Sequence, residues 1–208
     1  MAAPQGPPAR IRVVGQALTG LVARFPAAWP LVRRPMRRFF DREAPDWDSV
    51  QRAGVRLAAF EAGLEALGEP PARVLDLGTG TGSAAEAMAA RWPSARVTGV
   101  DISEQMIERA RAKSLPDRVS FQVADASALP FPAAEFDLVT HNNVPVFFGE
   151  VARVLAPGGH VLVAASLGAA TPFHTPSSVL RRGFARHGVD EEARGEAGPG
   201  VWWLGRRG

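Results

Sequence analysis

A regular alternation of short β-like runs and helical segments constrains the fold of this chain more than any other feature. Five apolar, β-rich runs occupy residues 73–77, 95–101, 118–124, 135–141 and 160–167. Helical patterns occupy residues 83–91, 103–114, 146–155 and 176–187. Such an alternation predicts right-handed βαβ crossovers, and therefore a parallel sheet with helices on both faces.

Two further segments flank this alternation. Apolar residues recur at helical spacing over residues 50–67 and stop at Gly68, which two prolines follow after Glu69. Near the other end, the runs 192–197 and 201–207 are joined by a Gly-Pro-Gly segment and predict a hairpin at the edge of the sheet. The 208 residues are enough for one α/β domain with its own core.

A glycine-rich turn follows the first predicted strand. Residues 74–82, VLDLGTGTG, place Gly78, Gly80 and Gly82 at the carboxyl end of that strand, where open α/β sheets bind ligands. A dinucleotide loop would need a glycine at the position of Ser83. The loop by itself is either a ligand site or a turn that needs glycine for conformational reasons, and its pattern departs from that of a nicotinamide oxidoreductase.

The acidic residue ahead of the loop narrows the ligand further. Asp76 stands two residues before the first glycine, where a carboxylate would repel a pyrophosphate on the helix N-terminus. A phosphate-binding P-loop is excluded, because it needs a GK[ST] ending and the chain's one lysine is Lys113. The loop suits a ligand that carries positive charge.

Two more acids follow the next two predicted strands. Asp101 ends the second strand, 19 residues after Gly82, where an acid can accept hydrogen bonds from both ribose hydroxyls. The alternative role, an N-cap for the next helix, can be filled by Ser103. Asp125 follows the third strand, where it could accept a hydrogen bond from an adenine amino group while the amide of Ala126 faces a ring nitrogen.

The ordered series VLDLGTGTG, VTGVDIS, DASALPFPAAEFDLV and RVLAPGGHVLV resembles the class I S-adenosylmethionine-dependent methyltransferases, in the group that includes quinone-biosynthesis and other small-molecule enzymes. The resemblance covers residues 46–208. It implies an α/β fold with a Rossmann-like, doubly wound, seven-stranded and mostly parallel sheet whose last strand is antiparallel. The residues 150–163, EVARVLAPGGHVLV, themselves predict a helix, a tight PGG turn and a buried strand.

The same resemblance implies S-adenosyl-L-methionine as the cofactor. Asp76 would hold its ammonium group, the Gly78–Gly80 backbone its methionine and ribose parts, and Asp101 its ribose. The implied cofactor-binding set is Asp76, Gly78, Thr79, Gly80, Asp101, Ile102, Met106, Asp125, Ala126 and Asn142. Carboxylates without a phosphate cradle suit a ligand with sulfonium and ammonium charges.

The methyl group arrives activated on such a cofactor, so catalysis depends mainly on positioning and no catalytic triad is expected. His141, at the end of the fourth strand, is the candidate general base; its alternative role is that of a capping or hydrogen-bonded polar residue. The aromatic residues that could line an acceptor pocket, or belong to the core, are Phe147, Phe148, Phe173, Trp202 and Trp203.

The acceptor is predicted to be a small, apolar molecule. Amino-group methylases of nucleic acids carry a [DNS]-P-P-[YF] tetrapeptide after the fourth strand, where this chain has HNNVP, so a nucleic-acid acceptor is disfavoured. The segment from residue 142 to 154 is also shorter than the family's usual connection and lacks its His-rich stretch. The identity of the acceptor therefore stays open.

Composition excludes other kinds of site. The chain has no cysteine, which excludes disulfides, iron–sulfur clusters and thiol catalysis, and its four histidines argue against a metal site. Residues 1–42 hold eight arginines and one acid, a charge of +7, whereas the rest of the chain has 16 bases and 20 acids, a charge of −4. We therefore expect a basic amphipathic arm over residues 1–45 and the methyltransferase domain over 46–208.

The arm contains an apolar stretch over residues 13–32, but Arg24 and two prolines argue against a transmembrane helix. No small-residue cleavage site follows, which argues against a signal peptide. The run RRPMRRFF at 33–40 either packs on the body with its arginines in water or rests on acidic protein, anionic lipid or substrate. We expect a cytoplasmic protein, with peripheral membrane contact through the arm as one option and a non-catalytic scaffold as the alternative function.

Overall fold

The computed structural model describes residues 16–22, 25–48 and 57–208, and the first part of the helix expected over 50–67 lies outside them. Seven strands form one sheet in the order β3-β2-β1-β4-β5-β7-β6. The strands are β1 (Arg73–Leu77), β2 (Arg96–Asp101), β3 (Val119–Val123), β4 (Phe136–Asn142), β5 (Leu155–Ala165), β6 (Val189–Ala197) and β7 (Gly200–Arg207). All neighbours pair in parallel except those of β7, which is antiparallel to β5 and β6. The predicted doubly wound sheet and its terminal hairpin are confirmed.

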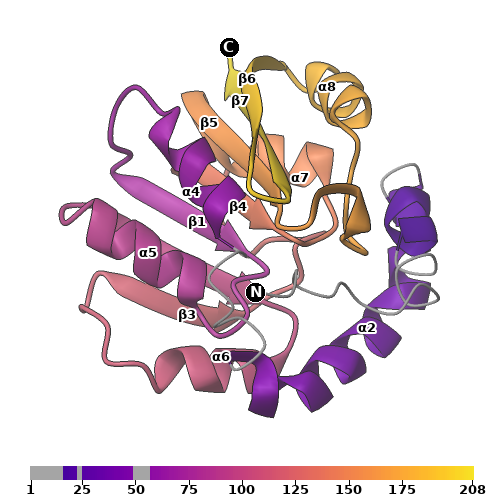
Figure 1. Cartoon of the computed structure of the whole chain (residues 1–208), viewed down its shortest axis with the longest axis vertical. Coiled ribbons are helices and arrows are strands. Elements are labelled where there is room, and N and C mark those ends of the chain that lie inside the picture. The colour runs from indigo at the N-terminus through magenta and orange to yellow at the C-terminus, as the bar shows by residue number, and fades with distance from the viewer. Residues whose placement is uncertain (1–15, 23–24, 49–56) are drawn as a thin grey trace.

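Helices cover both faces of this sheet (Figure 1). They are α4 (Ala58–Glu65), α5 (Ser83–Arg91), α6 (Glu104–Arg111), α7 (Phe148–Val154) and α8 (Ser177–Ala185). Alternate residues of β1 face two separate cores: Val74 packs with α4, α5 and α6, whereas Leu75 and Leu77 pack with α7 and α8. Apolar side chains on both faces are typical of a central parallel strand.

One local expectation was wrong. The PGG sequence does not form a separate tight turn, because β5 starts at Leu155, directly after α7, and runs through it. In the pairing of β4 with β5, Phe136 lies opposite Leu155 and Leu138 lies opposite His160. Residues 156–159 of β5 therefore bulge out of the regular pairing. Gly158 adopts a φ of +76°, which lets the extra residues fold out while the strand continues.

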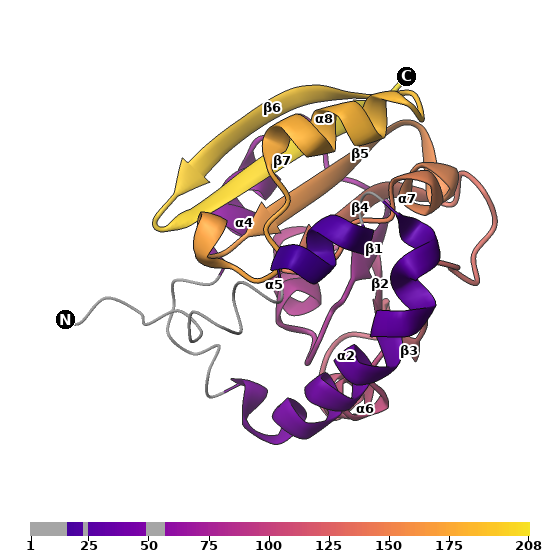
Figure 2. The ribbon, with the colours of Figure 1, turned by 90° about the vertical axis from the view of Figure 1, so that its right-hand side faces the viewer.

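The arm contributes a long helix, α2 (Trp29–Glu43), which follows the short η1 (Pro26–Ala28) and precedes η2 (Ala44–Asp46). Figure 2 shows α2 beside α6, at the opposite end of the molecule from α8 and the β6–β7 hairpin. The face of α2 that carries Trp29, Val32 and Met36 packs against Phe147 and Ile102 of the body. None of the helices in the described ranges combines the length and hydropathy that a membrane crossing requires.

Candidate active site

The order of the strands places a topological switch point between β1 and β4, with the glycine loop at the end of β1. Gly78, Gly80 and Gly82 have φ angles of +65°, +56° and +84°, in the left-handed region that favours glycine. A Cβ at position 78 would collide with the Val144 side chain, and one at position 80 would lie 3.3 Å from the indole nitrogen of Trp47. Only glycine fits this turn in its present conformation.

Asp76 lies at the foot of that loop and is 1% exposed. One of its carboxylate oxygens accepts a hydrogen bond from the Thr140 hydroxyl at 2.8 Å; the other has no donor in hydrogen-bond geometry among the described residues, although the Thr79 side chain is near enough to lower the pKa of Asp76. Burial raises the pKa of Asp76 to about 6. A buried carboxylate oxygen without a donor is costly, and it suits a cationic group of a ligand.

Asp101 connects the end of β2 to the glycine loop. Its carboxylate accepts hydrogen bonds from the backbone N–H of Gly80 at 3.0 Å and of Ser103 at 2.8 Å. Desolvation raises its pKa to about 6, although these bonds oppose the shift. The helix-capping role belongs to Ser103, whose hydroxyl accepts the N–H of Met106 at 3.2 Å, so the Asp101 side chain does not cap α6.

Asp125 follows β3 and is held by donors from two parts of the chain. Its Oδ1 accepts the Ser127 N–H at 2.9 Å, the Ser127 hydroxyl at 2.7 Å and the Trp29 indole N–H at 2.7 Å, while Oδ2 pairs with Arg33 at 3.2 Å. Partial burial alone would raise the pKa of Asp125, but the bonds from Ser127, Trp29 and Arg33 lower it. Asp125 is therefore held in its ionised form.

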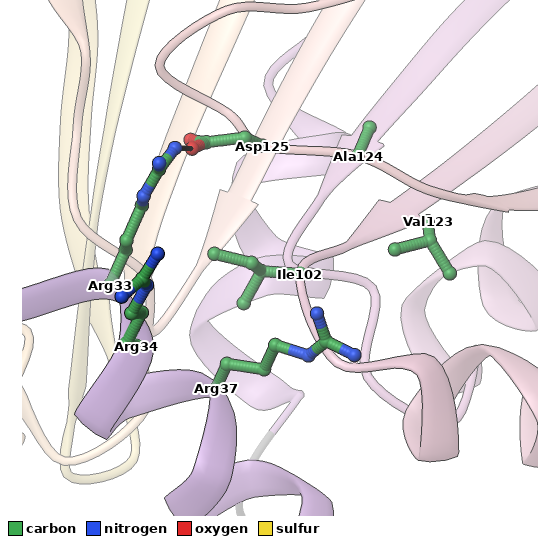
Figure 3. Close-up of a pocket in the computed structure, with 7 residues that line it drawn as sticks. All are labelled: Arg33, Arg34, Arg37, Ile102, Val123, Ala124 and Asp125. Carbon is green, nitrogen blue, oxygen red and sulfur yellow. Dashed lines mark hydrogen bonds and ion pairs between the residues drawn. The ribbon is translucent and has the colours of Figure 1, made fainter. Parts of the chain in front are cut away.

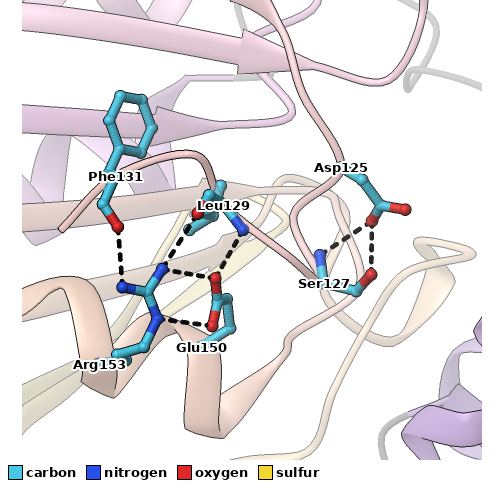
Figure 4. A network of polar contacts seen from close by, with 6 residues as sticks. All are labelled: Asp125, Ser127, Leu129, Phe131, Glu150 and Arg153. Atoms are coloured by element: carbon cyan, nitrogen blue, oxygen red, sulfur yellow. Dashed lines mark hydrogen bonds and ion pairs between the residues drawn. The ribbon is translucent and has the colours of Figure 1, made fainter. Parts of the chain in front are cut away.

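A clamp from α7 fixes the loop that carries Asp125 (Figure 4). Glu150 accepts the backbone N–H of Leu129 at 2.6 Å, and Arg153 donates to the carbonyls of Leu129 and Phe131 at 3.1 and 2.8 Å. Glu150 and Arg153 also pair with each other at 2.7 Å, which lowers the pKa of Glu150. Sequence reasoning missed this clamp, although a Glu and an Arg three residues apart on a helix are a known pairing signal.

His141 and Asn142 end β4. His141 is wholly buried, neither ring nitrogen has a partner among the described residues, and desolvation lowers its pKa to about 3. Thr140 directs its hydroxyl to Asp76, so the next side chain along the strand, His141, lies on the opposite face of the sheet. The Asn142 side-chain oxygen and the Thr79 hydroxyl are also buried without a partner in the described part of the chain.

A cavity of about 350 Å³ separates α2 from the ends of β2 and β3 (Figure 3). It is lined by Arg33, Arg34, Arg37, Ile102, Val123, Ala124 and Asp125. Two residues of the predicted cofactor set, Ile102 and Asp125, line it, whereas Met106 is 1% exposed and contributes to the core. The arm's contribution to this cavity was missed from the sequence.

Most of the candidate acceptor aromatics belong to the core. Trp203 stacks on Phe184 at 5.2 Å between ring centroids, and Phe147 packs edge-on against Trp29 at 5.1 Å. Phe173 differs, because it lies 6.0 Å from Phe40, which in turn lies 5.6 Å from Trp47 beside the glycine loop. Within the described ranges, no cluster of three or more His, Asp or Glu side chains is placed to hold a metal ion.

Comparisons with known proteins agree with this geometry. Residues 74–159 match the family model described as a methyltransferase domain. The chain is 37% identical over 168 residues to the ubiquinone/menaquinone biosynthesis C-methyltransferase UbiE of Syntrophotalea carbinolica, which covers 73% of this chain and 68% of that one. It is 38% identical over 144 residues to the malonyl-[acyl-carrier protein] O-methyltransferase of Halorhodospira halophila, covering 64% and 48%.

Among solved structures, a chain of the complex between the Haloferax volcanii Trm112 methyltransferase activator and a methyltransferase has a TM-score of 0.69 at 20% identity, covering 80% of this chain and 96% of that one. This likeness concerns the fold. The fold, the glycine loop and the relatives place the chain in the class I S-adenosylmethionine-dependent methyltransferases, whose cofactor is S-adenosyl-L-methionine. Its match spans 62% and 48% of the length of two curated relatives.

Proposed function

We propose that this chain transfers a methyl group from S-adenosyl-L-methionine to a small, largely apolar acceptor. The observation that carries the proposal is the unpaired, buried oxygen of Asp76 beside the three glycines. Together with Asp101 and Asp125 at the ends of β2 and β3, it forms a row of carboxylates at one edge of the sheet. When bound, the cofactor supplies an activated methyl group on a sulfonium.

The residues of the chain would hold that cofactor along its length. Asp76 would receive the ammonium group, and the backbone of Gly78, Thr79 and Gly80 would lie against the methionine and ribose parts. Each oxygen of the Asp101 carboxylate accepts one backbone N–H, and each can still accept a hydrogen bond from a ribose hydroxyl. Asp125 would bind the adenine, with Ile102 and Ala126 beside it. Met106 and Asn142 are the remaining residues of the proposed cofactor-binding set.

The chain's catalytic contribution in this proposal is positioning and the exclusion of water, which can lower a barrier by roughly 7 to 11 kcal/mol. His141 remains our candidate for contact with the acceptor, although its ring is wholly buried in this structure and lies on the face of the sheet opposite to Asp76. It is neutral at pH 7 because its pKa is about 3, so it can accept a hydrogen bond or a proton from a hydroxyl or an acidic carbon. A histidine with such a low pKa is a weak base. His141 is therefore better suited to orienting the acceptor through a hydrogen bond than to removing a proton from it quickly.

An apolar acceptor is supported by the aromatic series Phe173, Phe40 and Trp47, which leads towards Gly80. The names of the relatives cover both C-methylation of quinone precursors and O-methylation of a malonyl thioester. We therefore propose the class of reaction and leave the methylated atom open.

The test is methyl transfer from cofactor labelled on its methyl group, with isoprenoid quinone precursors and malonyl thioesters as acceptors, alongside calorimetry with S-adenosylhomocysteine. We expect binding, and label in at least one acceptor. Binding without label in any acceptor would favour the scaffold alternative, and absence of binding would refute the proposal. Asp76→Asn is the matched variant, which should weaken binding and lower the rate of transfer.

A second candidate role is peripheral contact of the arm with an anionic membrane. Four of the five large apolar side chains that are exposed in the described ranges lie in the arm: Leu21, Phe25, Leu31 and Phe39. Leu31 is 81% exposed, and Arg38 and Arg42 follow it at near-helical spacing. Arginines beside exposed apolar side chains suit anionic headgroups over acyl chains better than nucleic acid.

Sedimentation with vesicles of phosphatidylcholine, with and without one third phosphatidylglycerol, tests this role. We expect binding to the anionic vesicles that Leu31→Ser and Arg38→Gln weaken. Equal binding to neutral vesicles, or none to either, would contradict it, and so would a preference for RNA in a parallel assay.

A further inference from the structure

The arm reaches into the nucleobase end of the site through two donors on one carboxylate. Trp29 donates its indole N–H to Asp125 Oδ1 at 2.7 Å, and Arg33 pairs with Oδ2 at 3.2 Å. The backbone N–H and the hydroxyl of Ser127 also donate to Oδ1, so this oxygen already accepts three hydrogen bonds and has no room for another. An ionised carboxylate oxygen accepts about two hydrogen bonds, so the remaining acceptor position is on Oδ2, beside Arg33.

The cavity around that oxygen has the composition of a site for a flat, neutral ring. Ile102, Val123 and Ala124 provide an apolar wall, and Val123 is 45% exposed, an apolar side chain that a bound ring would cover. On the other side, α2 presents Arg33 and Arg37 (Figure 3). Guanidinium planes stack well on nucleobases.

We propose that Trp29, Arg33 and Arg37 of α2 are part of the nucleobase subsite. Trp29 is a positioning residue that fixes the orientation of Asp125, and the guanidinium groups of Arg33 and Arg37 cover the ring opposite Ile102. The free position on Asp125 Oδ2 selects a base with an exocyclic amino group. This inference rests on the proposed function, because it concerns how the cofactor's adenine is held.

Two of the three arginines that line the cavity, Arg33 and Arg37 but not Arg34, have acidic partners among the ion pairs of the described residues, which favours a base over a phosphate group at these two side chains. Arg33 is already paired with Asp125, and Arg37 is paired with Asp41 at 3.6 Å and with Glu104 at 3.5 Å. The carboxylate of Asp125 would also repel an anion. A ring with an amino group can donate a hydrogen bond to the Asp125 carboxylate while Arg33 and Arg37 stay paired with their acidic partners.

The experiment compares two ligands by calorimetry with the full chain: S-adenosylhomocysteine, and S-inosylhomocysteine, in which a carbonyl oxygen replaces the amino group. We expect the wild type to prefer the adenosyl ligand. Trp29→Phe keeps an aromatic ring but removes the N–H, and should weaken adenosyl binding about 3- to 10-fold with a smaller effect on the inosyl ligand, so that the preference shrinks. Arg33→Gln, at a half-exposed position, should weaken both ligands by lost stacking and reduce the preference as well.

Glu43→Gln, at an exposed position at the end of the same helix and outside the cavity, is the control and should bind both ligands as the wild type does. Unchanged affinities in Trp29→Phe and Arg33→Gln would overturn the inference and leave the proposed function standing. Equal losses for both ligands in both variants would also overturn it, because they indicate a structural role of the arm. A wild type that binds neither ligand would refute the proposed function and this inference together.

Discussion

Replacing Asp76 by asparagine should stabilise the ligand-free protein while it impairs cofactor binding. The carboxylate is 1% exposed and one of its oxygens has no donor in the described part of the chain. Burial raises its pKa from 3.8 to about 6, so ionising it in the folded protein is costly. At 1.36 kcal/mol for each pKa unit, the cost at pH 7 is about 3 kcal/mol.

The dependence on pH follows from linkage. Because the pKa is higher in the folded protein, the folded chain binds this proton more tightly than the unfolded chain does. The cost of ionisation is therefore small below pH 3.8, grows as the pH rises to about 6, and is constant above that. An asparagine cannot ionise, so we expect Asp76→Asn to be more stable than the wild type by about 3 kcal/mol at pH 7 and by less than about 1 kcal/mol at pH 4.

Urea unfolding at pH 4, 5, 6 and 7 measures this difference, and calorimetry with S-adenosylhomocysteine measures binding, which should weaken by about 1.5 to 3 kcal/mol. Asp190→Asn, at an exposed position on β6, is the control and should change stability by less than about 0.5 kcal/mol at every pH. A variant that is less stable than the wild type at pH 7, or a difference that does not vary with pH, would refute the reasoning.

Three further substitutions probe other parts of the site. Asp101→Ala should weaken S-adenosylhomocysteine binding by about 1 to 3 kcal/mol in calorimetry, and an unchanged Kd would argue against its ribose role. Gly78→Ala should lower the free energy of unfolding by about 1 to 3 kcal/mol, because φ is +65° at this position and the new Cβ collides with the Val144 side chain. In thermal unfolding, the double variant with Val144→Ala should recover part of that loss. If it recovers nothing, the contact does not cause the loss. The pKa of His141 is about 3 in the folded protein, below the ordinary 6.5, so the wild type loses stability as the pH falls below 6.5. In urea unfolding, His141→Leu should remove about 2 kcal/mol of the stability that the wild type loses between pH 7 and pH 5. Equal losses in both proteins would refute this.

The fold could be predicted from sequence because its signals are local. The strand at 73–77 and the helix at 83–91 occur at the expected residues, since an apolar run and a glycine turn specify them without help from distant segments. The bulge at 156–159 could not be predicted, because it depends on the register of β5 against β4. The same residues could form a turn in one register and a bulge in another.

The placement of a candidate site residue could be predicted where it depends on a single strand end. Asp76 lies near the end of β1, Asp101 ends β2 and Asp125 follows β3, and the parallel sheet brings these strand ends to one edge. The contacts of Trp29 and Arg33 with Asp125 were not predictable, because they join residues 96 and 92 positions apart and no local pattern encodes that pairing. Burial of His141 without partners likewise depends on the packing of the whole sheet.

The order of the strands also bears on when the protein can fold during synthesis. The arm is synthesised well before the residues it contacts: Thr19 donates to the carbonyl of Pro172, and Trp29 to Asp125. The strand β7, which joins β5 to the edge strand β6, is synthesised after the other six strands of the sheet. The arm must therefore wait for most of the chain, and Val22 and Trp29, which the folded protein buries, stay uncovered during that interval, when a nascent chain has most need of a chaperone.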